Sequence, residues 1–233
     1  ASNITISEGF RIVNAQNTYA AAKIKIRNKP WTAAIATYRA APPSFIVSGN
    51  IYGSDRLTPA TSTVKLVVGG VTAYSVQTNA SGAFAFPRVF SPPTSTVITM
   101  WLDNNSSSKQ GVLITRFGGG NITNANFYVQ HAVLRHEDLG PLIINDLSVC
   151  DRSTGAACSG DNDLIFDVDG SGTLTLFGSS TLYLYQNKTF SASSSLVLQG
   201  GGIMSLGTFS QITNATTTLL SSGSLATAGA GTI

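Results

Sequence analysis

A chain of 233 residues is long enough for one large domain or two ordinary ones. Only 11% of the residues are charged, compared with about 25% in typical soluble domains, so the Lys, Glu and Arg that normally cover exposed helices are scarce. This composition excludes a mainly helical protein and predicts an all-β fold. The formal net charge of +3 comes without a cluster of Arg and Lys interleaved with aromatic residues, so nucleic acid is not an expected partner.

Residues 1–44 are predicted to form an N-terminal β arm and a linker. Four apolar residues of the first segment share one face of an extended strand, interrupted by Glu8. These four residues are Ile4, Ile6, Phe10 and Ile12. Residues 17–26 stay ambiguous, because their alanines allow a short helix while Lys23 to Ile26 alternate as a strand. The sequence Ala-Pro-Pro-Ser at 41–44 then indicates a stiff linker.

Residues 45–131 contain at least six short runs of strand-forming residues, each ended by turn residues. Within one run, Val64, Leu66 and Val68 share a face. Short strands at this spacing predict a β-sandwich of the transthyretin or immunoglobulin type.

This segment resembles the carboxypeptidase-regulatory-like family over about residues 45–130. The resemblance rests on the opening sequence Val47–Tyr52, on Pro59 before the second strand, and on Thr78–Phe86, which is similar to the family's Thr-Asp/Asn-x-x-Gly-x-Phe-x-Phe hairpin. It implies a transthyretin-type β-sandwich that often occurs in secreted and surface proteins, and it brings no catalytic residue with it. The chain as a whole resembles the Ser/Thr/Gly-rich surface or filament proteins of prokaryotes.

The sequence pattern changes after residue 131, and residues 132–233 are predicted to form a β-solenoid-like domain. Pairs of leucines recur in short runs separated by small polar residues. The pairs are Leu174 and Leu176, Leu182 and Leu184, and Leu196 and Leu198. Repeated strand-and-turn units that each bury an apolar pair on the next are typical of a solenoid. An antiparallel jelly roll would produce similar runs and stays open as the alternative.

The two cysteines, Cys150 and Cys158, are predicted to form a disulfide that closes a small Gly-containing loop. Neither has a second Cys or a nearby His at the spacing of a zinc site; two reduced buried thiols are the alternative. A disulfide fits an oxidising compartment, and removal of a signal peptide, or an artificial truncation, would leave a start such as Ala1. No apolar run reaches the roughly 20 residues of a membrane-spanning helix. We therefore expect a secreted protein of the extracellular space or cell surface.

The charge is unevenly distributed along the chain. Residues 1–45 carry a net charge of +5, and residues 137–169 carry a net charge of −7. Such asymmetry favours head-to-tail contact between copies, although two independently solvated faces would give the same pattern.

One acidic segment has features of a calcium loop. Asp167 and Asp169 place carboxylate oxygens at alternate positions before a glycine. The expected bidentate Glu is absent, and Asp169-Gly170 fits a hairpin turn equally well. Calcium is the only cofactor that the sequence brings into consideration.

No catalytic residues are expected, and we do not predict an enzyme. His131 and His136 are an odd number of residues apart, so on one strand they would face opposite sides of a sheet. The sequence contains no Gly-x-Ser-x-Gly nucleophile elbow. Four aromatic residues are candidates for a sugar-stacking face, or for ordinary β-surface; they are Trp31, Trp101, Tyr183 and Tyr185.

Several Asn-x-Ser/Thr sequons occur, and Asn79, Asn104 and Asn105 lie in predicted turns. In a eukaryotic or archaeal exterior protein these three would be the better sites for N-glycosylation.

The leading hypothesis is a structural subunit of an extracellular filament, sheath or surface layer. Its copies would form a homopolymer by β-strand addition or edge stacking, with Ile4, Ile6, Phe10 and Ile12 buried in a neighbour. The alternative is a surface adhesin or carbohydrate-binding module of a larger secreted protein, with a glycan as its ligand. A solenoid polysaccharide lyase or hydrolase is disfavoured, because the acidic residues cluster around turns.

Overall fold

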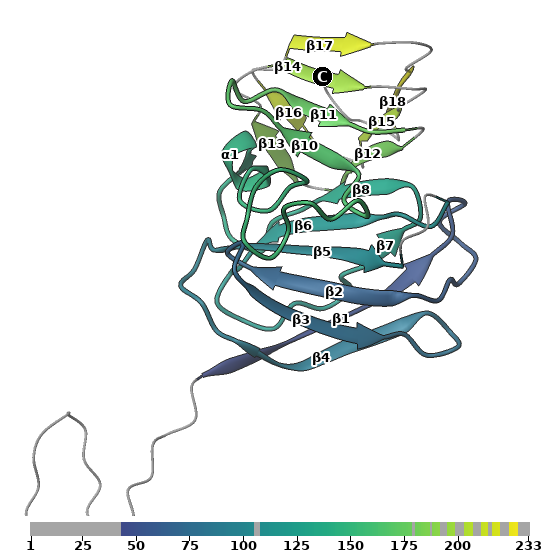
Figure 1. Ribbon diagram of the computed structural model, residues 1–233, viewed down its shortest axis with the longest axis vertical. Coiled ribbons are helices and arrows are strands. Elements are labelled where there is room, and N and C mark those ends of the chain that lie inside the picture. The colour runs from purple at the N-terminus through teal and green to yellow at the C-terminus, as the bar shows by residue number, and fades with distance from the viewer. Residues whose placement is uncertain are drawn as a thin grey trace, which may run out of the picture. The chain divides into compact units, whose positions relative to one another are not determined.

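The computed structural model describes residues 43–104, 108–178, 180–186 and 188–191, and beyond them the strands 195–198, 203–206, 211–213, 216–219 and 224–227. These residues belong to one compact unit, Ala41–Ile233 (Figure 1). The predicted arm, with Ile4, Ile6, Phe10 and Ile12, lies outside the described residues.

The fold is all-β, as the composition predicts. In the first half of the described chain the strands are β1 (Ser44–Tyr52), β2 (Thr63–Val68), β3 (Thr72–Gln77), β4 (Ala83–Phe90), β5 (Val97–Asp103), β6 (Val112–Arg116), β7 (Phe127–Tyr128), β8 (His131–Leu134) and β9 (Leu142–Ile143). In the second half they are β10 (Phe166–Val168), β11 (Leu174–Leu176), β12 (Thr181–Leu184), β13 (Thr189–Ser191), β14 (Ser195–Leu198), β15 (Ile203–Leu206), β16 (Gln211–Thr213), β17 (Thr216–Leu219) and β18 (Ser224–Thr227). The described residues contain one helix, the single turn α1 (Ile144–Leu147).

The first region is a β-sandwich, which we define as residues 43–130. Its smaller sheet has the order β4-β1-β7, with β1 antiparallel to β4 and parallel to β7. Its larger sheet contains β3, β2, β5 and β6, all in antiparallel pairs. Val64, Leu66 and Val68 share one buried face, as the alternation predicts, and Phe84 and Phe86 pack into the same core from the smaller sheet.

The turn that joins β3 to β4 explains why the Thr-Asn-x-x-Gly sequence occurs here. The Asn79 side-chain Oδ1 accepts hydrogen bonds from the backbone N–H groups of Ser81 and Ala83, at 3.0 and 2.9 Å. Gly82 has a φ of +77°, and a Cβ at that position would meet the carbonyl oxygens of Ile51 and Ala60. Glycine is required because a side chain would be both strained and obstructed there.

The larger sheet continues beyond the sandwich. β8 pairs in parallel with β6 on one side and with β12 on the other, so one eight-stranded sheet has the order β18-β15-β12-β8-β6-β5-β2-β3. The domain boundary expected at residues 131 and 132 falls inside β8 (His131–Leu134). Residues on both sides of that boundary thus share one backbone hydrogen-bond network.

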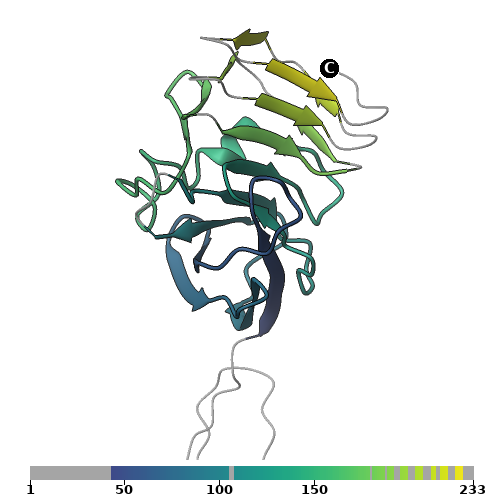
Figure 2. The same ribbon diagram turned by 90° about the vertical axis from the view of Figure 1, so that its right-hand side faces the viewer.

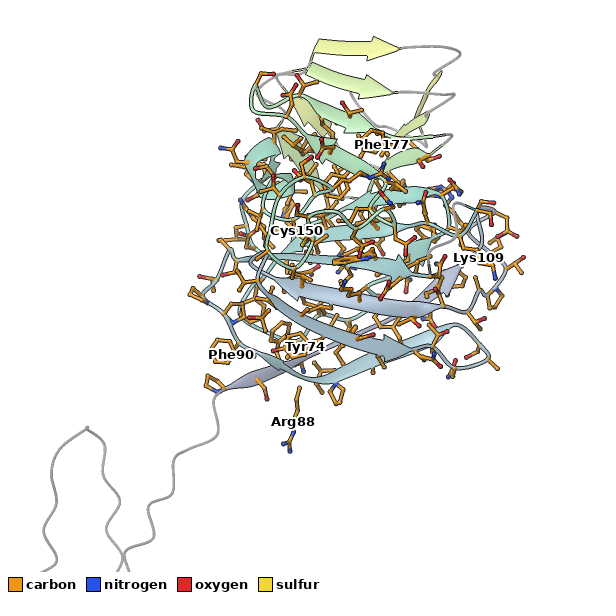
Figure 3. The ribbon with its side chains drawn as sticks, in the orientation of Figure 1. Tyr74, Arg88, Phe90, Lys109, Cys150 and Phe177 are labelled. Atoms are coloured by element: carbon orange, nitrogen blue, oxygen red, sulfur yellow. A yellow bond between two sulfur atoms is a disulfide. The ribbon has the colours of Figure 1, made fainter. Side chains whose placement is uncertain are left out.

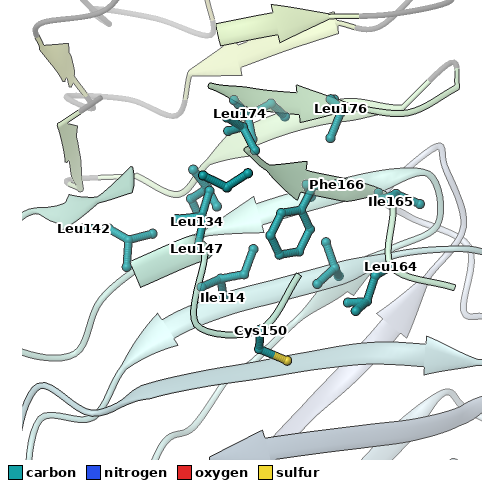
Figure 4. Close-up of a cluster of buried hydrophobic side chains, with 14 of the residues drawn as sticks. Ile114, Leu134, Leu142, Leu147, Cys150, Leu164, Ile165, Phe166, Leu174 and Leu176 are labelled. Carbon is teal, nitrogen blue, oxygen red and sulfur yellow. The ribbon is translucent and has the colours of Figure 1, made fainter. Parts of the chain in front are cut away.

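The shared strands of this sheet have a core on each face. On β6, Leu113 packs into the sandwich core, whereas Val112 and Ile114 face a second core. On β8, Val133 and Leu134 divide in the same way. The second core is covered by α1, the disulfide loop, β10 and β11. Figure 4 shows this core, with some of its residues labelled.

The second region consists of three ladders of parallel strands, which we call the stacked region (residues 131–227). Figure 2 shows the strands lying above one another in these ladders. They are β8-β12-β15-β18, β9-β13-β16 and β11-β14-β17. Thr181 pairs with Ile203 and Ile203 with Ser224, intervals of 22 and 21 residues. Three short strands therefore make up each repeat, whereas the neighbouring strands of a jelly roll would pair antiparallel.

Candidate functional site

The edges of the two sandwich sheets lie next to each other along β3 and β4. β3 is the end strand of the eight-stranded sheet, and β4 is an end strand of the three-stranded sheet. Although a short turn joins them, no ladder among the described residues pairs β3 with β4. Between them is a groove of about 240 Å³, which we call the β3–β4 groove. It is lined by Tyr74, Ser75, Val76, Ala85, Phe86, Pro87 and Arg88.

Alternation on β3 gives the groove an apolar wall. Tyr74 and Val76 are half-buried and pack against the sandwich core, while Ala73, Ser75 and Gln77 are exposed. An end strand in this position has a row of backbone N–H and C=O groups without a ladder partner on its outer side.

At one end of the groove a hydrogen bond joins the two edges. The backbone N–H of Phe90 donates to the Tyr74 hydroxyl at 3.0 Å. Figure 3 shows Tyr74 and Phe90 close together, with the Arg88 side chain extending away from the body. The turn at residues 78–82 closes the opposite end of the groove, because it connects β3 directly to β4.

The β4 edge is interrupted by a bulge. Phe45 pairs with Val89 and Val47 pairs with Phe86, so Pro87 and Arg88 lie together opposite one residue of β1. A bulge and a proline both weaken an edge as a template for strand pairing, since proline has no N–H. This site was not predicted from the sequence; Pro87 within a strand pattern is the signal that could have indicated it.

The chain enters the described body beside the same end of the groove. Ser44 pairs with Phe90, and the Ser91 N–H donates to the Pro43 carbonyl at 3.0 Å. Pro43, the first residue that the structure describes, therefore lies close to the contact between Phe90 and Tyr74.

The acidic segment 137–169 is bound internally. All eight of its carboxylates accept a hydrogen bond or form an ion pair within the described residues; these are Glu137, Asp138, Asp146, Asp151, Asp161, Asp163, Asp167 and Asp169. Arg116 contacts both Asp138 and Asp146, at 2.9 and 3.5 Å. The segment therefore holds its own loops and the second core together, and its net charge of −7 does not describe a free acidic face.

Cys150 and Cys158 form a disulfide within this segment. The buried Asp151 organises the loop, since its carboxylate accepts hydrogen bonds from the N–H groups of Ser153 and Thr154 at 2.9 and 2.6 Å. Burial raises the pKa of Asp151, against the effect of these hydrogen bonds. The loop packs against the second core through both sulfur-bearing side chains.

The candidate calcium residues lie in and after β10. Asp169 Oδ1 accepts hydrogen bonds from the N–H groups of Ser171 and Thr173, at 2.9 and 2.8 Å, and so builds the hairpin between β10 and β11. Asp167 accepts a hydrogen bond from the Ser153 N–H at 3.2 Å. Within the described residues, no three His, Cys, Asp or Glu side chains gather where they could hold a metal ion.

Both histidines are buried against backbone carbonyls. The Nδ1 atoms of His131 and His136 lie 2.8 Å from the carbonyl oxygens of Val129 and Asp138, respectively, so each Nδ1 is the donor. Burial lowers the pKa of both imidazoles, which favours their neutral forms. They belong to the packing of β8 and of the segment that follows it.

The aromatic candidates divide into a buried residue and a surface row. Trp101 is fully buried, and its Nε1 donates to Asp161 at 3.1 Å, so it is not available to stack on a sugar. Trp31 lies outside the described residues. Half-buried tyrosines form a row with ring centroids 6.0, 5.9 and 6.3 Å apart; they are Tyr52, Tyr128, Tyr183 and Tyr185. The exposed Arg56 lies over the Tyr183 ring at 5.2 Å.

The predicted glycosylation sites differ in how their side chains are used. Asn104 Nδ2, the atom to which a glycan would be attached, donates to Ser62 Oγ and Lys109 O at 3.2 and 3.1 Å. Asn79 is exposed, and the hydrogen bonds described for its side chain use Oδ1. Asn79 therefore suits glycan attachment better than Asn104 does, and Asn105 lies outside the described residues.

No family model, no curated protein and no solved structure matches the chain. The resemblance to the carboxypeptidase-regulatory-like family therefore stays a prediction. None of the described segments forms an apolar helix of membrane-spanning length.

Proposed function

We propose that this chain is a structural subunit of an extracellular filament, sheath or surface layer, and that its copies join by β-strand addition. The role is non-enzymatic, and the principal partner is a further copy of the same chain. Calcium is not required for it.

The observation that carries this proposal is the β3–β4 groove. It lies between two sheet edges that no ladder pairs with each other in the described residues, and it has an apolar wall of Tyr74 and Val76. Pro43 and Ser44, which follow residues 1–42 in the chain, lie beside its end. An added strand would satisfy the backbone groups of an edge and bury alternate side chains in the groove, which is how strand addition gives affinity. The apolar alternation within residues 4–12 supplies a strand of the required kind.

Two further features agree with a load-bearing role outside the cell. The eight-stranded sheet joins the sandwich to the stacked region without interruption, so force applied at either part is carried by backbone hydrogen bonds. The disulfide between Cys150 and Cys158 is stable in oxidising compartments.

Deletion of residues 1–13 tests the proposal. The full chain is expected to form regular fibres or sheets by electron microscopy, and the deletion variant is expected to remain monomeric. The variant should keep its β-rich circular dichroism spectrum, because the strands of the described body lie between Ser44 and Thr227. A full chain that stays monomeric under all assembly conditions contradicts the proposal, and so does a deletion variant that assembles as the full chain does.

The row of tyrosines favours a second candidate function, a surface adhesin or carbohydrate-binding module. Half-buried tyrosines present an apolar ring together with a polar hydroxyl, a combination suited to sugars. Saturable binding of the monomer to a glycan array, lost in the Tyr183→Ala variant, would favour this candidate over the structural role.

A further inference from the structure

We propose that the β3–β4 groove receives residues 4–12 of a second copy as an added strand, and that Arg88 of the groove pairs with Glu8 of that strand. This inference rests on the proposed structural function, and it specifies the acceptor, the donor segment and the contact that selects it.

The shape of the groove favours a strand with one apolar face. Its lining combines Tyr74 and Val76 from β3 with Phe86 from β4, all of which pack against the sandwich core. In the donor segment the even-numbered positions share one face, and the apolar residues at these positions are Ile4, Ile6, Phe10 and Ile12. Facing the groove, this side would bury large apolar groups that are costly to leave in water.

Glu8 stands at the one even-numbered position of this series that is not apolar. A carboxylate on the apolar face of a strand would be costly to bury without a partner of opposite charge. The groove offers such a partner, because Arg88 lines it, is exposed, and forms no ion pair with any carboxylate of the described residues. Figure 3 shows its side chain extending away from β4, where it can reach an added strand.

The two edges of the groove differ in what they offer to a backbone. β3 is a regular six-residue strand paired with β2 along its whole length. β4 has the bulge, and Pro87 has no N–H to donate. The added strand would therefore form its ladder with β3, while β4 contributes side-chain contacts and Arg88. The hydrogen bond from the Phe90 N–H to the Tyr74 hydroxyl joins the two edges at one end of the groove, so it must open to admit the strand.

The linker favours a second copy over the same chain. Pro42 and Pro43 restrict the backbone to extended conformations, and the Pro43 carbonyl is held by the Ser91 N–H. These restrictions disfavour a reversal of the chain into the groove immediately before Pro43. Residues 4–12 are separated from this point by 30 residues, which is ample length to reach a neighbour.

Charge reversal on the full chain tests the pairing. The variants Glu8→Arg and Arg88→Glu each place like charges at every joint, so each alone should assemble only above a critical concentration at least about tenfold higher than that of the wild type. An equimolar mixture of the two variants restores an opposite pair at every joint between unlike copies. The mixture should therefore assemble close to the wild-type concentration, and the rescue should weaken as the salt concentration rises.

Lys109→Glu is the matched control, because Lys109 is also an exposed cation but lies away from the groove. It should assemble as the wild type does. Melting temperatures and circular dichroism of the monomers should be unchanged in Arg88→Glu and Lys109→Glu, since both side chains are exposed.

Each outcome has a distinct meaning. A chain that carries both Glu8→Arg and Arg88→Glu distinguishes the two copies. If this double variant assembles at the wild-type concentration but the mixture of the single variants does not, the donor strand belongs to the same copy and the inference is wrong. If both single variants assemble as the wild type does, Arg88 and Glu8 do not meet, although the structural function stands. If the wild type itself never assembles, the structural function fails together with the inference.

Discussion

Most strands of the sandwich pair antiparallel, whereas most strands of the stacked region pair parallel. In the sandwich, β2 pairs antiparallel with β3, its neighbour in the chain. In the stacked region the three long ladders join strands that are parallel, and only the hairpin partner β10 pairs antiparallel among the described strands. In one of these ladders β12 pairs with β8, with Thr181 opposite His131. Contacts between residues so far apart in sequence carry a larger entropic cost of loop closure before they are formed.

The difference in pairing bears on how the terminal strand of each parallel ladder is covered. A stack of parallel strands needs a cap, because its terminal strand is an open edge. Here the sandwich supplies that cap, since β8 lies between β6 and β12 in one sheet. The ladder of β11 is capped differently, by the antiparallel hairpin partner β10. The sandwich thus provides an ordered edge on which the ladder of β12, β15 and β18 is built.

The largest expected effect tests whether the two regions unfold together. Leu113 and Ile114 are fully buried neighbours on β6 that face the sandwich core and the second core, respectively. Replacing either with Ala should lower the free energy of unfolding by about 2–5 kcal/mol. Because β6 belongs to both cores, we expect both variants to shift the same single transition in differential scanning calorimetry.

Val71→Ala is the control for this pair, because Val71 is 69% exposed and its truncation removes little buried surface. Two separate transitions, of which Leu113→Ala moves only one and Ile114→Ala only the other, would show that the regions fold independently in spite of the shared sheet.

A smaller effect is expected from the disulfide, which belongs to the stacked region's side of the shared sheet. Replacing Cys150 and Cys158 together with Ser removes a cross-link between residues eight positions apart. In the chain-entropy model this lowers stability by about 2–3 kcal/mol. Hydrogen exchange should increase in the loop and in β10 more than in β1 and β4, because both cysteines pack into the second core. Equal increases in both regions would contradict this localisation.

The local features of both regions could be predicted from the sequence, and the long-range ones could not. The all-β class follows from composition, and the buried faces of β2 and β4 follow from alternation. The parallel pairing of β6, β8 and β12 leaves no local signal, since their partners come from distant parts of the chain. The same limit applies to the acidic segment: its charge is visible in the sequence, but its partners within the chain, such as Lys65 and Arg116, are not.

For the proposed strand-addition site, the sequence provides the candidate donor segment but not the proposed acceptor. Alternation in residues 4–12 is a local pattern. The β3–β4 groove arises because two strands joined by a short turn belong to different sheets, and the sequence around the turn at residues 78–82 would fit an ordinary hairpin equally well. Similarly, Trp101 was a candidate for sugar stacking until its strand proved to be buried on both faces.

The smallest expected effect concerns the buried ion pairs that attach the segment after β8 to the end of β6. Asp138 and Asp146 both contact Arg116, and all three side chains are 12 or 13% exposed. Burial acts to raise the pKa of Asp138, but the Ser95 hydroxyl and the Arg116 guanidinium outweigh it and lower the pKa below its ordinary value. For Asp146 burial dominates and raises the pKa. The two carboxylates should therefore contribute to stability with opposite signs.

A lowered pKa means that folded Asp138 binds its proton less readily than the unfolded chain does, so its contribution is present above the ordinary Asp pKa of about 3.9 and is lost as the pH falls through the lowered value. The raised pKa of Asp146 means that its ionised form costs stability at neutral pH, and this cost disappears as the pH falls below the raised value. At pH 7 we expect Asp138→Asn to reduce the free energy of unfolding by about 1.5–3 kcal/mol, because two charged hydrogen bonds are weakened.

Asp146→Asn should change stability by less than about 1 kcal/mol at pH 7, since its 3.5 Å contact with Arg116 is long and an Asn oxygen can still accept the Ile143 N–H. Urea unfolding between pH 3 and pH 7 measures both effects. The Asp138→Asn variant should lose less stability on acidification than the wild type does, because the carboxylate that must be protonated is gone. If Asp146→Asn proves the more damaging of the two, then the ion pair with Arg116 outweighs the burial of the Asp146 carboxylate, and the opposite signs assigned to these two residues are wrong.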